Sequence, residues 1–149
     1  SFLGLNNDGR VAIVRTKGNP HGHIVLRGGE SGPNYDTVSI AMAEAAIAKA
    51  KLPANIVVDC SHANSSKKPE LQPLVMADVV NQIRAGNKSI LGVMIESNIE
   101  AGNQPIPADL SQLKYGCSVT DGCIGWETTE KTIRDAAVLL RDVLPERLG

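Results

Sequence analysis

Short apolar runs that end abruptly in polar residues recur along the chain. Three of them, at residues 24–26, 56–58 and 90–95, are rich in Ile and Val. Apolar runs of this length, ended by polar or glycine residues, predict strands buried on both faces, as in parallel sheets. A weaker run at residues 117–120 predicts a fourth, very short strand.

Helical periodicity occupies the segments between and after these runs. Asp36 is placed to cap a helix over residues 37–51, and a second helix is expected over about 70–85. A last helix is expected to be capped by Thr128 and stopped by Pro145. The side chains expected to face inward recur every three or four residues. In chain order they are Val38, Ala41, Met42, Ala45 and Ala48, then Leu71, Leu74, Val75, Val79 and Ile83, then Ile133, Ala136, Ala137, Leu140, Val143 and Leu144.

Two further segments do not fit this alternation. Residues 2–5 and 10–16 are β-prone and flank Asp8-Gly9, a dipeptide that predicts a β-hairpin. Residues 99–116 lack periodicity and contain several glycines and prolines. A loop of this length in a compact domain is usually functional or disordered.

Strands that alternate with helices predict an α/β fold with a parallel sheet. A sheet of three or four parallel strands leaves two open edges, whereas parallel sheets normally have both faces covered. A (β/α)8 TIM barrel needs about 250 residues, and this chain has 149 and does not begin with Met. We therefore expect residues 1–149 to be the C-terminal segment of one barrel domain, comprising its last three or four βα units, with the N-terminal half absent. Residues 1–16 would be an inserted hairpin.

Composition and charge limit the classes of partner. Hydrophobic residues make up 42% and charged residues 21%, and the formal net charge is −1. These values are ordinary for a globular protein and argue against a general affinity for nucleic acid or acidic membranes. The sequence shows neither a run of transmembrane length nor a signal peptide, so the expected location is cytoplasmic. The three cysteines contain no C-x-x-C pair, which favours reduced thiols over a disulfide framework or a zinc ribbon.

The expected strand exits carry the candidate chemistry. Arg27, His62 within the polar run 59–67, Glu96 and Asp121 each follow one of the apolar runs. The carboxyl ends of parallel strands lie on one side of an α/β fold, where ligands bind. One imidazole and two carboxylates predict a divalent metal site that suits Mn, Fe, Co or Zn. Arg27, followed by two glycines, suits a phosphate, because guanidinium binds oxyanions in a bidentate manner.

Each of these residues also has a structural alternative. His62 is as readily a hydrogen-bonding core histidine, Glu96 a helix cap or an ion-pair partner, and Asp121 a turn residue. Arg27 is equally compatible with a structural ion pair. The functional interpretation is favoured by recurrence, since every apolar run ends in a potential ligand and none ends in an ordinary polar turn.

Five strings resemble motifs of type I 3-deoxy-D-arabino-heptulosonate 7-phosphate (DAHP) synthase, and they occur in that family's order along the whole chain. They are Leu26-Arg27-Gly28-Gly29, residues 59–67 (DCSHANSSK), residues 92–97 (GVMIES), Gly102-Asn103-Gln104, and residues 118–127 (SVTDGCIGWE). The resemblance implies a (β/α)8 barrel that condenses phosphoenolpyruvate with erythrose 4-phosphate to give DAHP and phosphate. This is the first step of the shikimate pathway to the aromatic amino acids, and it requires a divalent metal.

The resemblance also assigns residue roles. His62, Glu96 and Asp121 match three metal ligands of the family, and Arg27 matches an arginine that binds the phosphate of phosphoenolpyruvate. The opening hairpin matches a regulatory hairpin that lies away from the catalytic mouth and helps to form a feedback-inhibitor site. The family's cysteine ligand and its Lys-Pro-Arg-Thr motif belong to the first half of the barrel and do not occur here. The chain is therefore expected to be inactive alone and to form homo-oligomers that cover its open edges.

Two other hypotheses remain open at this stage. The chain is compatible with a non-catalytic phosphate- or metal-binding module that uses Arg27 and residues 61–67. It is also compatible with a regulatory partner that pairs through the hairpin and the sheet edges. The second is less favoured, because a regulator has no need to keep His62, Glu96 and Asp121 together.

Overall fold

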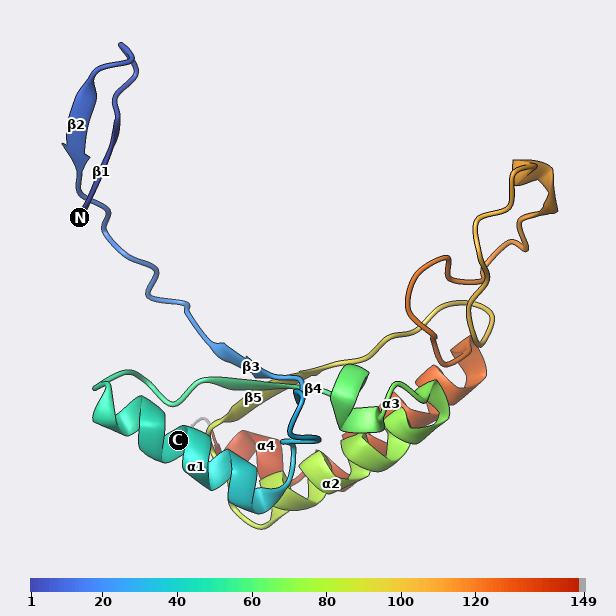
Figure 1. The fold of residues 1–149 in the computed structure, drawn as a ribbon. Coiled ribbons are helices and arrows are strands. Elements are labelled where there is room, and N and C mark those ends of the chain that lie inside the picture. The colour runs from blue at the N-terminus through green and yellow to red at the C-terminus, as the bar shows by residue number, and fades with distance from the viewer. Residues whose placement is uncertain (148–149) are drawn as a thin grey trace.

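The computed structural model describes residues 1–147 and has an α/β architecture (Figure 1). Three parallel strands, β3 (Ile24–Leu26), β4 (Ile56–Asp59) and β5 (Ile90–Met94), form a sheet in the order β3-β4-β5. Helices α1 (Thr37–Lys49), α2 (Gln72–Arg84) and α3 (Trp126–Leu140) lie on the same side of this sheet. The alternation of parallel strands and helices is confirmed, and within residues 1–147 one face of the sheet has no helix on it.

The central strand β4 organises the hydrophobic core. Ile56, Val58 and, just past the strand, Cys60 are completely buried. They pack with buried side chains of the three helices and β5, namely Ile40, Ile47, Val75, Val79, Val80, Ile83, Ile90, Ala136 and Leu140. Side chains alternate between the faces of a strand, so Val57 and Asp59 lie on the face without helices.

The edge strand β3 is less buried than its apolar sequence predicts. Ile24 and Val25 are exposed, Val25 by 46%. β3 pairs only with β4, and its other edge and one of its faces have no neighbour among residues 1–147. The expectation that this strand is buried on both faces is therefore wrong for the described part of the chain.

The buried face of α1 also differs from the one expected. The structure buries Ile40 and Ile47, whereas Val38 and Met42 are 68% and 69% exposed. Most of this helix is apolar, so hydrophobic spacing alone does not single out one face. The two isoleucines face the sheet, because they fill the core better than the alanines of the expected stripe.

Helix α2 agrees with the expectation apart from its first turn. A 3-10 turn, η2 (Pro69–Leu71), precedes the helix, which then runs to Arg84. Val75, Val79 and Ile83 are buried as predicted, but Leu74 is exposed.

Helix α3 starts and stops at different residues from those expected. Gly125 rather than Thr128 occupies the N-cap position, and the helix ends at Leu140. Pro145 does not stop it but lies inside a separate short helix, α4 (Val143–Glu146). Proline is tolerated there because the first turn of a helix has no intrahelical partner for its N–H groups. Of the expected inner face, Ala136 and Leu140 are buried, whereas Ile133 is exposed.

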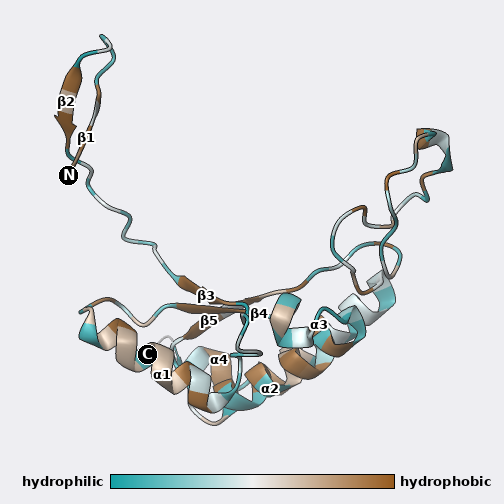
Figure 2. Cartoon of the chain, viewed as in Figure 1, coloured by the Kyte–Doolittle hydropathy of each residue, from teal (hydrophilic) through white to brown (hydrophobic). Residues whose placement is uncertain are grey.

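The predicted hairpin is present. β1 (Phe2–Leu5) pairs antiparallel with β2 (Val11–Val14), and the Asn6 side chain accepts hydrogen bonds from the backbone N–H groups of Asp8 and Arg10. Figure 1 shows the hairpin standing away from the sheet on an extended segment, and Figure 2 shows that both its strands are hydrophobic. The hairpin therefore exposes apolar side chains on both faces, including Phe2, Leu3, Leu5, Val11 and Ile13.

Residues 99–116 form the predicted long loop, which includes one 3-10 turn, η3 (Leu110–Gln112). The expected strand at 117–120 is absent from the structure: this segment forms only one isolated bridge, between Ser118 and Asn103. Side chains take the place of a ladder, because Gln104 donates to the Cys117 carbonyl and Asn103 donates to the Thr120 carbonyl. Among residues 1–147, no helix combines the length and the apolar character that a membrane span requires.

Candidate metal and phosphate site

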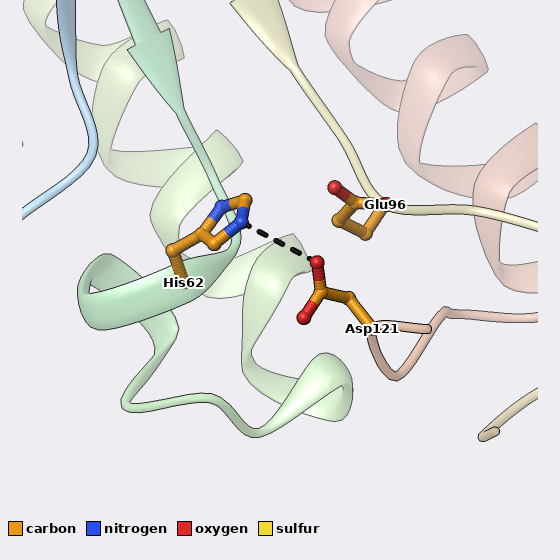
Figure 3. Close-up of side chains that lie close together, drawn as sticks. All are labelled: His62, Glu96 and Asp121. Atoms are coloured by element: carbon orange, nitrogen blue, oxygen red, sulfur yellow. Dashed lines mark ion pairs between the residues drawn. The ribbon is translucent and has the colours of Figure 1, made fainter. Parts of the chain in front are cut away.

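The structure brings together the three residues that the sequence singles out as metal ligands (Figure 3). One ligand atom each from His62, Glu96 and Asp121 lies within 4.8 Å of the others. The three residues follow β4, β5 and the 117–120 segment respectively. Such a set of one imidazole and two carboxylates fits a divalent transition metal.

His62 is oriented by a buried carboxylate behind it. Its Nδ1 lies 2.6 Å from Oδ2 of Asp59, which is only 1% exposed. The other carboxylate oxygen, Oδ1, accepts hydrogen bonds from the backbone N–H and the hydroxyl of Ser61, at 2.8 and 2.7 Å. Asp59 therefore holds the imidazole proton on Nδ1. This leaves Nε2, which lies 3.6 Å from Oδ2 of Asp121, as the ring nitrogen that would bind a metal.

The backbone at His62 is strained in a way that aims its side chain. His62 has a φ of 51°, in the left-handed region, at the start of the 3-10 turn η1 (His62–Ser65). This conformation costs a non-glycine residue about 1–2 kcal/mol. The contact with Asp59 and a 2.7 Å hydrogen bond from Lys67 N–H to the His62 carbonyl hold it in place. Backbone strain of this kind is concentrated at functional sites.

The backbone of Glu96 is held from two sides. The Gln72 side chain hydrogen-bonds both its N–H and its carbonyl, and the Ile124 N–H donates to the same carbonyl at 3.0 Å. Asp121 lies three residues before Ile124, and its side chain is 65% exposed. The two carboxylates thus come from segments that are joined by a backbone hydrogen bond. Solvent reaches the cluster from the Asp121 side.

A cavity of about 220 Å³ opens beside the cluster. Besides the three candidate ligands it is lined by polar side chains, among them Ser61, Ser65, Lys67, Asn103 and Thr120. Lys67 supplies a cation at a site that otherwise carries two carboxylates. A phosphorylated ligand is the kind of molecule that such a mixed lining can bind.

Arg27 follows β3 and is exposed; it is not among the residues that line the cavity. Within residues 1–147 its guanidinium forms no ion pair. The exits of β3 and β4 are nevertheless tied together, because the Asn64 side chain donates to the carbonyls of Leu26 and Asp59 at 2.9 and 2.8 Å. Arg27, the residue predicted to bind phosphate, thus lies at the same end of the sheet as the His62, Glu96 and Asp121 cluster, but outside the cavity.

The thiols near the site are protonated, packed groups. Burial, reinforced by the negative charge of Asp59, raises the pKa of Cys60 to about 12. Burial is also the main cause that raises the pKa of Cys123 above its ordinary value, with smaller contributions from the charges of Glu96 and Asp121. All three cysteines are free, in agreement with the expectation from the sequence.

Two residues with a clear place in the site were not identified from the sequence. Asp59 ends a strand, and only its polarity distinguishes it in the sequence. The prediction of a metal ligand in this segment rests on His62. Gln72 lies at a helix start, where a polar residue is ordinary. In both cases the only signal is three-dimensional, since each side chain is almost fully buried and hydrogen-bonded to a candidate ligand.

Comparison with known proteins gives an independent assignment. Residues 2–134 match the DAHP synthetase I family. The Tyr-sensitive phospho-2-dehydro-3-deoxyheptonate aldolase of Escherichia coli K12 is 49% identical over 148 residues, which cover 99% of this chain and 41% of that protein. Its counterpart in Salmonella typhimurium is 50% identical over 134 residues, covering 90% of this chain and 37% of that protein.

Comparison with solved structures agrees with the sequence comparison. The structure of phospho-2-dehydro-3-deoxyheptonate aldolase from Francisella tularensis superposes with a TM-score of 0.83 at 43% identity, covering 94% of this chain and 40% of that one. The chain thus spans about two fifths of the length of these relatives. The match to the family extends over most of the described residues and includes every candidate ligand, so the chain belongs to the DAHP synthetase I family.

Proposed function

We propose that this chain supplies one wall of the active site of a DAHP synthase, a transferase of aromatic amino acid biosynthesis. The reaction joins carbon 3 of phosphoenolpyruvate to the aldehyde carbon of erythrose 4-phosphate, adds water to carbon 2 of phosphoenolpyruvate and releases inorganic phosphate. The observation that carries the proposal is the convergence of His62, Glu96 and Asp121 to within 4.8 Å, in a chain that matches this family.

The residues of this chain fit a divalent metal. The imidazole Nε2 of His62 and the carboxylates of Glu96 and Asp121 would hold it, and the donor set suits Mn, Fe, Co or Zn. When bound, the ion supplies Lewis-acid chemistry that polarises a carbonyl oxygen. Asp59 keeps the proton on Nδ1 of His62, so that Nε2 stays available as a ligand.

The remaining charges of this wall serve the two phosphorylated substrates. Arg27, which is exposed at the exit of β3, is proposed to bind the phosphate of phosphoenolpyruvate through its guanidinium fork. Glu96 and Asp121 place negative charge beside the cavity, where it stabilises positive charge that develops on the enol carbon as the new bond forms. Lys67 adds a cation to the lining of the same cavity.

We propose further that residues 1–149 are the last βα units of a (β/α)8 barrel with an inserted hairpin at residues 1–16. In support, the three strands are parallel, the helices lie on one side, and the exposed Val25 of β3, paired with Val57, faces the side without helices. In a barrel this bare face would be the packed interior and the free edges would pair with further strands. The rest of the barrel would provide the facing wall of the site.

Substitution of His62 in the complete enzyme tests the assignment. We expect His62→Ala to lower metal-dependent DAHP formation by at least about 100-fold, because a metal contributes several kcal/mol to the transition state and each 1.4 kcal/mol is a factor of ten. His21→Ala, an exposed histidine in the segment after the hairpin, is the matched control and should remain active. Retention of full metal-dependent activity by His62→Ala would show that the site assignment is wrong.

A further inference from the structure

The peptide of Glu96 lies beyond the end of the strand ladder that precedes it. The last pair between β4 and β5 is Asp59 with Met94, and one more backbone bond joins Cys60 N–H to the Met94 carbonyl at 2.8 Å. The chain after β4 then turns away into η1. Glu96, two residues past Met94, therefore has no strand neighbour on that side in the described part of the chain.

The side chain of Gln72 fills this position. Its Nε2 donates to the Glu96 carbonyl at 3.0 Å, and its Oε1 accepts from the Glu96 N–H at 2.9 Å. A residue on an adjacent antiparallel strand makes the same pair of bonds with its backbone. Gln72 is 1% exposed and is the first residue of α2, so the helix start fixes its backbone while its amide acts as a one-residue strand.

Through the Glu96 peptide, Gln72 is also linked to the segments that carry the other two candidate ligands. The Glu96 carbonyl also accepts from Ile124 N–H, and Asn98 N–H donates back to the Ile124 carbonyl at 3.1 Å. Asp121 lies on that same segment. On the other side, two short 3-10 turns, η1 and η2, link Gln72 to His62.

We propose that Gln72 is a positioning residue that fixes the Glu96 carboxylate in the geometry required for metal binding. The inference rests on the proposed function of the cluster. Without the amide, the part-buried Glu96 N–H and one direction of its carbonyl lose their partner. Relieving those unpaired groups rotates or shifts the peptide, because a donor that is shielded from water and has no acceptor costs up to about 1–3 kcal/mol. The side chain of Glu96 moves with its peptide.

A second glutamine in the same helix provides a control that distinguishes positioning of the metal ligand from stabilisation of the fold. Gln82 is also buried, and its Nε2 donates to the Tyr35 carbonyl at 2.8 Å and to Asp78 at 2.6 Å. It lies ten residues further along α2, about 15 Å at the rise of an α-helix. Loss of its amide should cost a similar free energy of unfolding without touching the metal site.

The experiment compares Gln72→Met with Gln82→Met in the complete protein, because methionine keeps the volume and removes the hydrogen bonds. The measured quantities are the dissociation constant for Mn²⁺, the visible absorption of bound Co²⁺ and the thermal midpoint. We expect both variants to lower the midpoint. Only Gln72→Met should weaken Mn²⁺ binding, by about 10- to 100-fold, the range found for residues that orient metal ligands, and only it should alter the Co²⁺ spectrum.

Gln72→Asn is the second variant, for the case in which Gln72→Met does not fold. Its amide is one methylene shorter and cannot reach both the N–H and the carbonyl of Glu96, so we expect weaker Mn²⁺ binding and an altered spectrum. Wild-type affinity and spectrum in a folded Gln72 variant would overturn the inference and leave the proposed function standing, and so would equal losses of affinity in the Gln72 and Gln82 variants. Failure of the unmodified protein to bind Mn²⁺ and Co²⁺ would overturn both.

Discussion

Asp59 illustrates how a single side chain determines what its neighbour can do. The backbone N–H of Ser61 can only donate, and it donates to Oδ1 of Asp59. Oδ2 is therefore the oxygen that pairs with His62. Asparagine at this position would turn its carbonyl oxygen to Ser61 and its NH₂ group to the imidazole. The NH₂ would donate to Nδ1, the proton of the ring would move to Nε2, and Nε2 could no longer bind a metal.

We therefore expect Asp59→Asn in the complete protein to weaken Mn²⁺ binding by about 10- to 100-fold, measured by titration. The matched control is Asp109→Asn, since Asp109 makes the same pair of bonds to Ser111 but, in the described structure, forms no ion pair with a histidine. An unchanged affinity in Asp59→Asn, or an equal loss in Asp109→Asn, would contradict the proposed role of this carboxylate.

Gly28 is the residue at which the exit of β3 meets the His62 turn. It has a φ of +71°, and an added Cβ would lie 2.7 Å from the Ala63 Cβ and 3.0 Å from the Gly32 carbonyl oxygen. We expect Gly28→Ala to lower the free energy of unfolding by about 1–3 kcal/mol, from left-handed strain and overpacking together. Gly29→Ala is the control, because its Cβ would meet no atom within 4 Å. Urea unfolding of both variants measures the difference, and equal stabilities would refute the close approach.

At the scale of elements, α1 starts where the sequence predicts because its cap is local. Asp36 accepts hydrogen bonds from the backbone N–H groups of Val38 and Ser39 and from the Ser39 hydroxyl. The Ser39 hydroxyl, followed by the Ser39 backbone, is the main cause that lowers the pKa of Asp36 from its ordinary value of 3.8. We expect Asp36→Ala to cost about 1 kcal/mol of stability at neutral pH, as is typical of N-caps.

The pH dependence of this cap follows from the direction of the shift. A lowered pKa in the folded state means that the stabilisation is present above pH 3.8 and is lost as the pH falls through the lower, folded value. Chemical unfolding of wild type and Asp36→Ala should therefore differ near pH 7 and converge in acid. A difference that stayed constant down to pH 2 would show that the charge of Asp36 plays no part.

At the scale of the whole molecule, the open sheet is the dominant feature. One face and two edges of β3-β4-β5 have little cover, and the hairpin exposes further apolar side chains. Unpaired edges promote association between chains. We expect the 149-residue chain alone to form oligomers or aggregates in light scattering, and a monodisperse monomer would contradict this.

The same feature predicts the activity of the chain in isolation. The 149-residue chain should show negligible DAHP formation by itself, because in the proposed barrel the wall facing His62, Glu96 and Asp121 would come from further strands. Mixing it with the complementary N-terminal segment of the enzyme should restore metal-dependent activity. Full activity of the chain alone would refute the proposed division of the site.

Local rules explain the features of the fold that the sequence predicted correctly. The Asp8-Gly9 hairpin, the Asp36 cap and the order of strands and helices each depend on neighbouring residues or on a strong apolar run. The buried face of α1 was predicted wrongly because the helix is apolar nearly all round and only the sheet decides which side chains it covers. The strand expected at 117–120 was wrong because the side chains of Asn103 and Gln104 take its hydrogen bonds.

The sequence by itself also determined the candidate ligands. His62, Glu96 and Asp121 follow apolar runs and match motifs of a family to which the chain belongs. Only the tertiary structure brought their ligand atoms within 4.8 Å of one another and revealed the buried side chains behind them. Asp59 and Gln72 act through hydrogen bonds whose partners are set by how strands and helices pack, and no spacing along the chain encodes that distance. Ligand identity is a property of residue type, whereas ligand geometry is a property of the packed fold.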